Sequence, residues 1–412
     1  MKNKKYFSCY IKITSFFFYI LPILIITGPF LPDLILSLSC IYFLIINFIR
    51  KDFKYFNNLF FKIFLIFYSY LVIRSLFTNY YSTIFYIRFG IFPLIVLQLI
   101  DHNKNFEKFF FRTIFFTLIF ISLDALFQHF TGKNVIGLKE YTPDRTSGFF
   151  GDKGRLGSYI VRLYPFALIY LFIYLQVKDK YKNYLFVIIL NLFLITVIYS
   201  GERTALFLVL LSFFLLAIFK ISNWRIYLFS FSIFCLLFFI IYQKEATVKN
   251  RIILNTKDQL GLSENYIPKK IFSETHQFHY SIAIRMFKDN LFFGQGINSF
   301  RNNCFKEKFR IDEKNSGCTT HPHNIYIQLL AETGFFGFIF LLSAFIFVCY
   351  KMFLSIFLAN NKKNYYLFKF FLLNLSIVIN FFPFTPTGNF FNNWTSILLV
   401  MPIGFFLKRL VK

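Results

Sequence analysis

One short segment concentrates the side chains best suited to proton transfer. It spans residues 321–337, reads HPHNIYIQLLAETGFFG, and begins with His321 and His323. The unperturbed pKa of histidine lies near neutrality, so an imidazole here could accept a proton from a sugar hydroxyl, although a lone histidine at such a place is more often structural. Three polar side chains follow at i, i+4 and i+8 and share one face of a predicted helix: Asn324, Gln328 and Glu332.

Two cysteines precede this segment and leave two interpretations open. Cys304 and Cys318, taken with the two histidines, supply the ligand types of a zinc site, but no close cysteine pair is present. An oxidising compartment favours a disulfide between them, and free thiols remain an alternative. His276 and His279 lie three residues apart and could bind a metal, but an exposed helix face is the simpler expectation.

The composition indicates that lipid surrounds most of the chain. Of 412 residues, 57% are hydrophobic and 67 are phenylalanine, an excess that a water-soluble globule could hide only by burying nearly every residue. We predict an all-α polytopic integral membrane protein with about twelve transmembrane helices, because that many apolar stretches are long enough to cross a bilayer. They cover residues 10–29, 31–49, 61–77, 83–100, 109–130, 156–177, 184–200, 202–219, 224–242, 324–350, 365–384 and 394–410.

The basic residues behind the formal charge of +26 fall between the apolar stretches, so they indicate topology and not a nucleic-acid site. Lysine and arginine are retained in the cytoplasm, and they occur in the connections after the even-numbered predicted helices. The short odd-numbered connections carry none, which places both termini in the cytoplasm. The residues used are Arg50, Lys51, Lys54, Lys104, Lys108, Lys178, Lys180, Lys182, Lys220, Arg225, Lys351, Lys362 and Lys363.

Two odd-numbered connections are long and polar, residues 131–155 and 243–322, and both are predicted to be periplasmic because long loops translocate regardless of charge. The chain thus divides into residues 1–242 with nine helices and the smaller loop, the large loop 243–322, and residues 323–412 with three helices. Within the large loop, residues 273–288 predict an amphipathic helix, followed by a Gly294-Gln-Gly296 turn.

Four arginines lie near the predicted periplasmic ends of their helices, which is the side that basic residues usually avoid. Each taken alone could extend to the interface as a snorkelling side chain. Together they suggest an anion at the outer membrane boundary, because guanidinium groups suit bidentate phosphate recognition. They are Arg74, Arg88, Arg162 and Arg203, and Arg145 and Arg155 of the smaller loop are further candidates for phosphate or saccharide contacts.

Three motifs in order resemble the O-antigen ligase and polymerase superfamily of bacterial membrane glycosyltransferases. His323-Asn324 is followed after nine residues by Gly334-x-x-Gly337, directly after the large loop. Ser200-Gly-Glu-Arg203-Thr204 is similar to the family's Ser-x-x-Arg-Thr element. Ile284-Arg285-Met286, with the Gly294-Gln-Gly296 turn, is similar to its loop arginine and Gly-x-Gly turn.

The resemblance implies an O-antigen ligase in the inner membrane that transfers a glycan from undecaprenyl diphosphate to a lipid A-core acceptor at the periplasmic face. It implies that His323 is the general base and that Arg203 and Arg285 hold the diphosphate, with inversion of the anomeric centre and no metal or cofactor. From position we add substrate-binding roles for Arg74, Arg88, Arg162, Arg145, Arg155, His321, Asn324, Gln328 and Glu332.

Other functions stay open at this stage. A polymerase would use a second lipid-linked glycan as acceptor on a similar scaffold, and the compact histidine motif with one dominant loop favours the ligase. A third member of the family glycosylates proteins. A transporter is the alternative of a different class, but its site is expected near the bilayer midplane and in related halves, and we find neither.

Overall fold

The computed structural model describes residues 2–142, 145–218, 224–260, 262, 272–311, 317–358 and 365–410. Helices and their connecting turns make up these ranges, and no β-strand occurs in them beyond two isolated bridges within residues 133–145. The predicted all-α class is confirmed. Three of the lysines used to assign orientation, Lys220, Lys362 and Lys363, lie outside the described residues.

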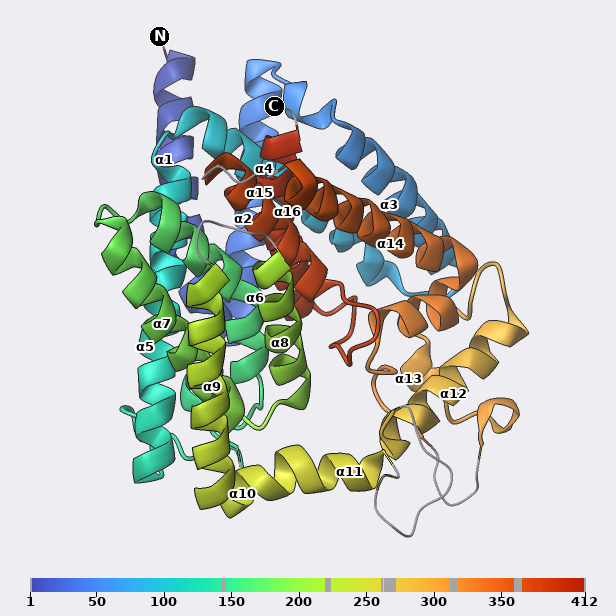
Figure 1. Ribbon diagram of the computed structural model, residues 1–412. Coiled ribbons are helices and arrows are strands. Elements are labelled where there is room, and N and C mark those ends of the chain that lie inside the picture. The colour runs from blue at the N-terminus through green and yellow to red at the C-terminus, as the bar shows by residue number, and fades with distance from the viewer. Residues whose placement is uncertain are drawn as a thin grey trace.

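Each predicted apolar stretch coincides with a helix of the bundle (Figure 1). In the described residues, nine spans are long and apolar enough to cross a membrane, while α8 and α15 are apolar but shorter, so the number twelve stays a prediction. The bundle helices are α1 (Lys2–Ile26), α2 (Phe30–Arg50), α3 (Leu59–Phe77), α4 (Ile87–His102), α5 (Phe106–Thr131), α6 (Leu156–Ile169), α7 (Asp179–Tyr199), α8 (Arg203–Ile218), α9 (Trp224–Lys244), α14 (Ile325–Leu358), α15 (Tyr365–Asn380) and α16 (Asn393–Leu410).

The two ends of the chain lie at the same end of the bundle, at the top of Figure 1. The large loop emerges at the opposite end, where α10 (Ala246–Val248) and α11 (Asn255–Gln259) cross beneath the helices. This arrangement agrees with an even number of crossings. Which end faces the cytoplasm remains the prediction made from the basic residues.

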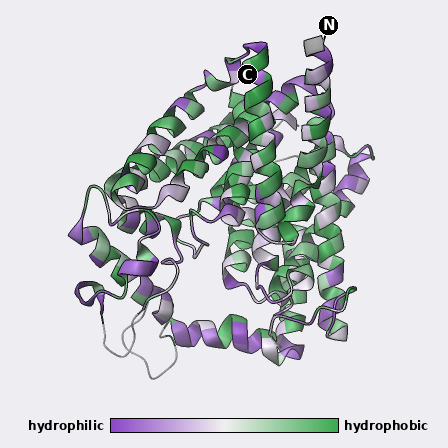
Figure 2. Cartoon of the chain, turned by 180° about the vertical axis from the view of Figure 1, so that it is seen from behind, coloured by the Kyte–Doolittle hydropathy of each residue, from purple (hydrophilic) through white to green (hydrophobic). Residues whose placement is uncertain are grey.

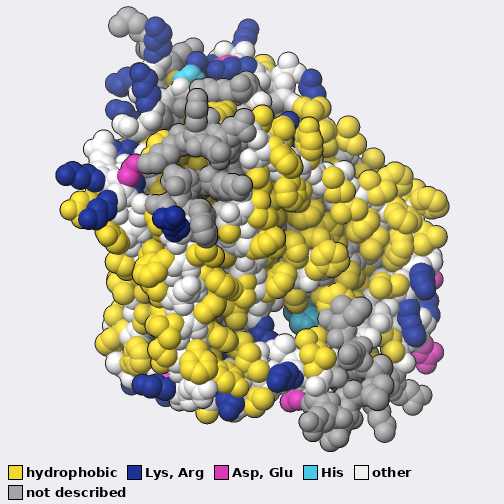
Figure 3. Space-filling model, in the orientation of Figure 1, with side chains coloured by type: hydrophobic (Ala, Val, Ile, Leu, Met, Phe, Trp, Pro, Cys, Tyr) yellow, Lys and Arg dark blue, Asp and Glu magenta, His cyan; other side chains and the backbone are white. Residues whose placement is uncertain are grey.

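Four helices form the centre of the bundle: α4, α6, α15 and α16. α16 packs on α4, and α15 packs on both α6 and α14. α6 is the most enclosed of the nine spans, and nearly all of its residues are buried. The outward surface of the bundle is largely apolar (Figures 2 and 3), as expected where lipid replaces water. Arg162 is therefore unusual, because it is a charged residue buried in the most enclosed helix.

The described part of the large loop forms two units. The first, which we call the strap, is residues 246–259, made of α10, a π-helical turn (Lys249–Leu254) and α11. The second packs α12 (Glu274–Asp289) against α13 (Phe300–Asn303) and the start of α14 around a small apolar cluster. The amphipathic helix predicted at 273–288 is confirmed as α12, whose buried face includes Ile282 and Met286.

The helix α14 is broken at Gly334, where φ is 65° and ψ is −159°. The large loop packs against α14 at this break. Gln295 N–H donates to the carbonyl of Ala331 at 2.8 Å, and Phe335 N–H donates to the carbonyl of Leu291 at 2.9 Å. Gly334 and Gly294 meet at this crossing. A Cβ on Gly334 would lie 2.3 Å from the Phe292 carbonyl oxygen. The close partner of Gly334 is therefore the backbone of the large loop.

Candidate active site

A cavity of about 720 Å³ lies where the bundle meets the large loop. Its walls come from the smaller loop and the start of α6, the turn before α8, the strap, α12, α13, the segment before α14 and the loop between α15 and α16. Figure 3 shows this hollow, with histidine and basic side chains visible in it. Its lining, among the described residues, has one carboxylate, Glu202, with three histidines and six arginines: His276, His321, His323, Arg145, Arg155, Arg162, Arg203, Arg251 and Arg301.

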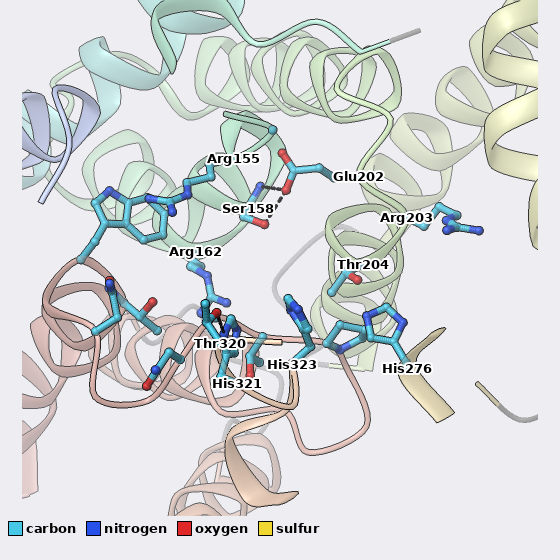
Figure 4. Close-up of a pocket in the computed structure, with 18 of the residues that line it drawn as sticks. Arg155, Ser158, Arg162, Glu202, Arg203, Thr204, His276, Thr320, His321 and His323 are labelled. Atoms are coloured by element: carbon cyan, nitrogen blue, oxygen red, sulfur yellow. Dashed lines mark hydrogen bonds between the residues drawn. The ribbon is translucent and has the colours of Figure 1, made fainter. Parts of the chain in front are cut away.

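The one carboxylate is engaged by the protein itself. Glu202 accepts hydrogen bonds from the backbone N–H groups of Gly157 (2.7 Å) and Ser158 (3.0 Å) and from the Ser158 hydroxyl (2.5 Å) (Figure 4). It thereby caps the first turn of α6, where a negative charge is favourable.

Three arginines gather around the turn at residues 200–204. Arg145 Nε donates to the Ser200 carbonyl at 3.2 Å, and Arg251 Nε donates to the Gly201 carbonyl at 3.0 Å. Arg203 begins α8, and its Nη1 donates to the Thr256 hydroxyl of the strap at 3.2 Å. Guanidinium groups held this close repel one another, and an anion between them would relieve the repulsion.

The remaining three arginines reach the cavity from other directions. The buried Arg162 donates from Nη1 to Asn380 Oδ1 at 2.7 Å. Arg155 lies over the Trp394 ring, with 5.0 Å between its Cζ and the ring centroid. Arg301, on α13, makes no side-chain hydrogen bond with any described residue. The cavity is thus suited to bind a multiply charged anion such as a diphosphate.

His323 is held in an uncommon backbone conformation beside these arginines. Its φ is 56°, a left-handed value that non-glycine residues rarely adopt, and its carbonyl accepts the Thr387 N–H at 2.8 Å. Burial, followed by the charges of neighbouring histidines, lowers the pKa of His323 to about 3. The imidazole is therefore neutral at physiological pH, which is the state that a general base requires.

Three further histidines surround His323. Its ring centroid lies 4.2 Å from that of His321, 5.5 Å from that of His279 and 5.7 Å from that of His276. His279 is only 5% exposed, and its Nδ1 lies 2.7 Å from the Gly317 carbonyl oxygen. The expectation of an exposed helix face at His276 and His279 was wrong, because this part of α12 packs against the segment that carries His323.

The polar side chains predicted to share one face of α14 bind neighbouring loops and do not line the cavity. They are Asn324, Gln328 and Glu332. Asn324 donates to the Pro383 carbonyl at 2.7 Å, while its Oδ1 accepts the N–H groups that begin α14. Gln328 Nε2 donates to Asn389 Oδ1 at 2.9 Å, and Glu332 Oε1 accepts the Phe300 N–H at 3.1 Å. These side chains therefore fix the loops beside α14, and their placement gives no support to the expected substrate contacts.

Three of the expected arginines also lie outside the cavity lining. Arg74 donates to the Gly294 carbonyl at 3.1 Å and so holds the loop turn, whereas Arg88 forms an ion pair of 2.8 Å with Asp33. Arg285 is exposed on α12 and donates to the Arg310 carbonyl. The structure thus brings Arg162, Arg203, Arg145, Arg155 and His321 together with His323 but leaves Arg74, Arg88 and Arg285 apart.

Cys304 and Cys318 form a disulfide, with 5.4 Å between their Cα atoms. This pairing removes both thiolates that the zinc interpretation required. Within the described ranges, no three His, Cys, Asp or Glu side chains are grouped as a metal site. The disulfide joins the end of α13 to the loop segment that leads into His321 and His323, and so it anchors that segment.

Sequence reasoning missed two of the cavity arginines, Arg251 and Arg301. Both lie in the large loop, where basic residues are numerous and most are lysine. Only arginine offers a planar fork to phosphate. A sequence analysis that weighted arginine above lysine for this reason would have selected both. The polar loop between α15 and α16, which contributes Thr387, Asn389 and Asn392, carried no comparable signal.

Comparison with known proteins agrees with this geometry. No curated protein matches the chain. Residues 185–342 match the family model described as O-antigen ligase (Wzy_C), and this range holds the Ser-Gly-Glu-Arg-Thr turn, the strap, α12, α13 and the first part of α14. The resemblance seen in the three motifs is thereby confirmed: residues 185–342 carry a domain of the O-antigen ligase superfamily, whose members are ligase-type or polymerase-type membrane glycosyltransferases.

Proposed function

We propose that this protein is an O-antigen ligase that transfers a glycan from undecaprenyl diphosphate to a lipid A-core acceptor. The observation that carries the proposal is that six arginines and a neutral histidine line the same cavity at the junction of bundle and loop. A lipid-linked diphosphate would bring its charged group to this depth while its hydrocarbon chain stays in the bilayer.

The chemistry follows from the groups on the cavity wall. His323 accepts the proton of the acceptor hydroxyl, and the oxygen attacks the anomeric carbon of the donor sugar. The bond from that carbon to the diphosphate oxygen breaks, and its electron pair leaves with the diphosphate. One displacement of this kind inverts the anomeric centre. Guanidinium groups of the cavity stabilise the negative charge on the departing oxygen, which is the task that a metal ion performs in other transferases.

The division of labour among the arginines is also part of the proposal. Arg203, with Arg145 and Arg251 at the same turn, is assigned to the diphosphate because these groups converge on one place. Arg162 and Arg155 lie on the deeper wall of the cavity near α6 and are not assigned to the diphosphate. Arg285 receives no role, because its guanidinium binds the Arg310 carbonyl at the surface of α12.

The site is assigned to the periplasmic face of the inner membrane. The basic short connections and both termini lie on the other side by the positive-inside rule. The two chain ends at the opposite end of the bundle from the strap support this assignment (Figure 1). A disulfide in the large loop also supports it, since such bonds persist in the periplasm.

The test is glycan transfer by the purified full-length protein, with undecaprenyl-diphosphate-linked glycan, lipid A-core and a chelator. We expect glycan on the lipid core with the wild type and none with His323→Ala, while both proteins insert and unfold alike. Longer lipid-linked chains would reassign the protein as a polymerase, and glycan on an added protein acceptor would make it a protein glycosyltransferase. If no product forms with any acceptor, the transporter becomes the favoured interpretation.

A further inference from the structure

Four of the six histidines of the chain cluster around the proposed base, three of them in the cavity lining, which is more than a single general base needs. In the proposed reaction, on which this inference rests, His323 becomes an imidazolium each time an acceptor hydroxyl is consumed. It must lose that proton before the next turnover. The question is where the proton goes.

The surroundings of His323 disfavour the imidazolium. The cavity contains six guanidinium groups, and its one described carboxylate is bound to the first turn of α6. Once the diphosphate has left, Glu202, held at the first turn of α6, is the one described lining side chain of opposite charge. A neighbouring group that accepts the proton and passes it to water would speed this release.

Of the three neighbours, His279 is poorly placed for this and His321 is restricted. His279 is buried, does not line the cavity, and faces the Gly317 carbonyl, which can only accept; its Nδ1 must therefore carry the hydrogen. His321 Nδ1 contacts the Thr320 hydroxyl at 2.9 Å, and its Nε2 is buried without a hydrogen-bond partner in the described residues. His279 therefore offers no path from His323 to solvent, and His321 keeps a route only through its Nδ1 and the exposed Thr320 hydroxyl.

His276 has both contacts that such a path needs. It lines the cavity, its ring lies 5.7 Å from that of His323 at an interplanar angle of 82°, and its side chain is only partly buried. Its Nδ1 lies 2.6 Å from the Ser273 hydroxyl, which fixes the ring, and the next residue, Gln277, is exposed. Figure 4 shows His276 beside His323, toward the side of Arg203.

We propose that His276 is a proton relay that takes the proton from His323 and delivers it to the water outside the cavity. The acceptor O–H bond breaks and a bond to hydrogen forms on His323. That N–H then breaks as one forms on His276, directly or across one water, and the proton ends in the solvent. Each transfer thus releases one proton, which balances the new glycosidic bond and the departing diphosphate. The groups that face His276 and would tune it are His279, His323, Arg203 and Tyr280.

The experiment compares steady-state transfer by the full-length wild type, His276→Ala and His276→Gln, with and without added imidazole. Gln277→Ala is the matched control, since it changes an exposed neighbour on the same helix. We expect both His276 variants to lose roughly 10-fold or more in kcat at unchanged KM, within the range of general acid-base contributions. Added imidazole should restore part of the His276→Ala rate, and the control should behave as the wild type.

Several outcomes would overturn the relay. His276→Ala or His276→Gln with the wild-type kcat would do so, because glutamine keeps a polar side chain but cannot carry the proton. If the loss of kcat accompanies a lower thermal midpoint and added imidazole does not restore the rate, His276 has a structural role instead. If the wild type transfers no glycan to any acceptor, the proposed function itself fails and the relay fails with it, which is a different result from an active wild type with active His276 variants.

Discussion

The crossing of the large loop and α14 gives the sharpest test of how this site is held together. Gly334 has φ 65° and ψ −159°, a conformation open essentially to glycine alone, and forcing another residue into it costs about 1–3 kcal/mol. In addition, the Cβ of an alanine would lie 2.3 Å from the Phe292 carbonyl oxygen, and such overpacking costs typically about 1–3 kcal/mol. Gly334→Ala should therefore destabilise the protein by about 2–6 kcal/mol.

Gly132 provides the matched control. It also has a positive φ, 77°, as the residue that ends α5, but a Cβ there would meet nothing within 4 Å. Gly132→Ala should cost only about 1–2 kcal/mol of left-handed strain. The difference between the two variants isolates the clash at the crossing.

The assay is thermal unfolding of both variants in the same detergent, together with glycan transfer. Gly334→Ala should unfold at a clearly lower temperature than Gly132→Ala and should lose activity, because the first part of α14 carries the His323 segment at its start. Equal midpoints for the two variants would refute the reasoning, since the loop and α14 would then not be interlocked at Gly334.

Three other predictions address the site. Because the pKa of His323 in the free protein is lowered to about 3, its base form persists as pH falls; kcat/KM for the donor should stay flat from pH 7.5 to 5.5, and a loss of about tenfold, expected for an unperturbed histidine, would contradict this. Arg203→Lys keeps the charge but loses the fork, so kcat/KM should fall roughly 10- to 100-fold, from about 1.5–3 kcal/mol for a charged hydrogen bond; near-full activity would argue against a bidentate phosphate contact. Cys304→Ser removes the disulfide and should lower stability by about 3 kcal/mol, seen as a thermal midpoint that no longer responds to reductant; a midpoint equal to that of the oxidised wild type would contradict it.

The sequence by itself determined the class of the protein and the positions of its helices. Apolar runs of about twenty residues can satisfy their backbone in lipid only as helices, so the runs and the helices coincide. The histidine motif likewise could be recognised, because its residues are contiguous and its roles depend on residue type. The helix in the large loop was predictable for the same local reason, since its apolar residues recur with helical spacing.

Only the tertiary structure decided which charged residues share a cavity. Arg162 and Arg203 reach it while Arg74 and Arg88 do not, although all four were placed at similar depth by sequence. The reason is that depth fixes only the position along the membrane normal, whereas the neighbours of a helix face depend on packing.

The large loop shows the same limit. Arg285 was singled out by its motif, yet it lies on the exposed side of α12, whereas Arg251 and Arg301 enter the cavity through contacts made by segments distant in sequence. Gly294 and Gly334 illustrate the cause: each could be read as a flexible position in its own segment, but the backbone contact between them exists only once the loop has docked in the break of α14. Local sequence determines the elements, and the docking of loop on bundle determines the site, because it is long-range contact that turns separate basic residues into one binding surface.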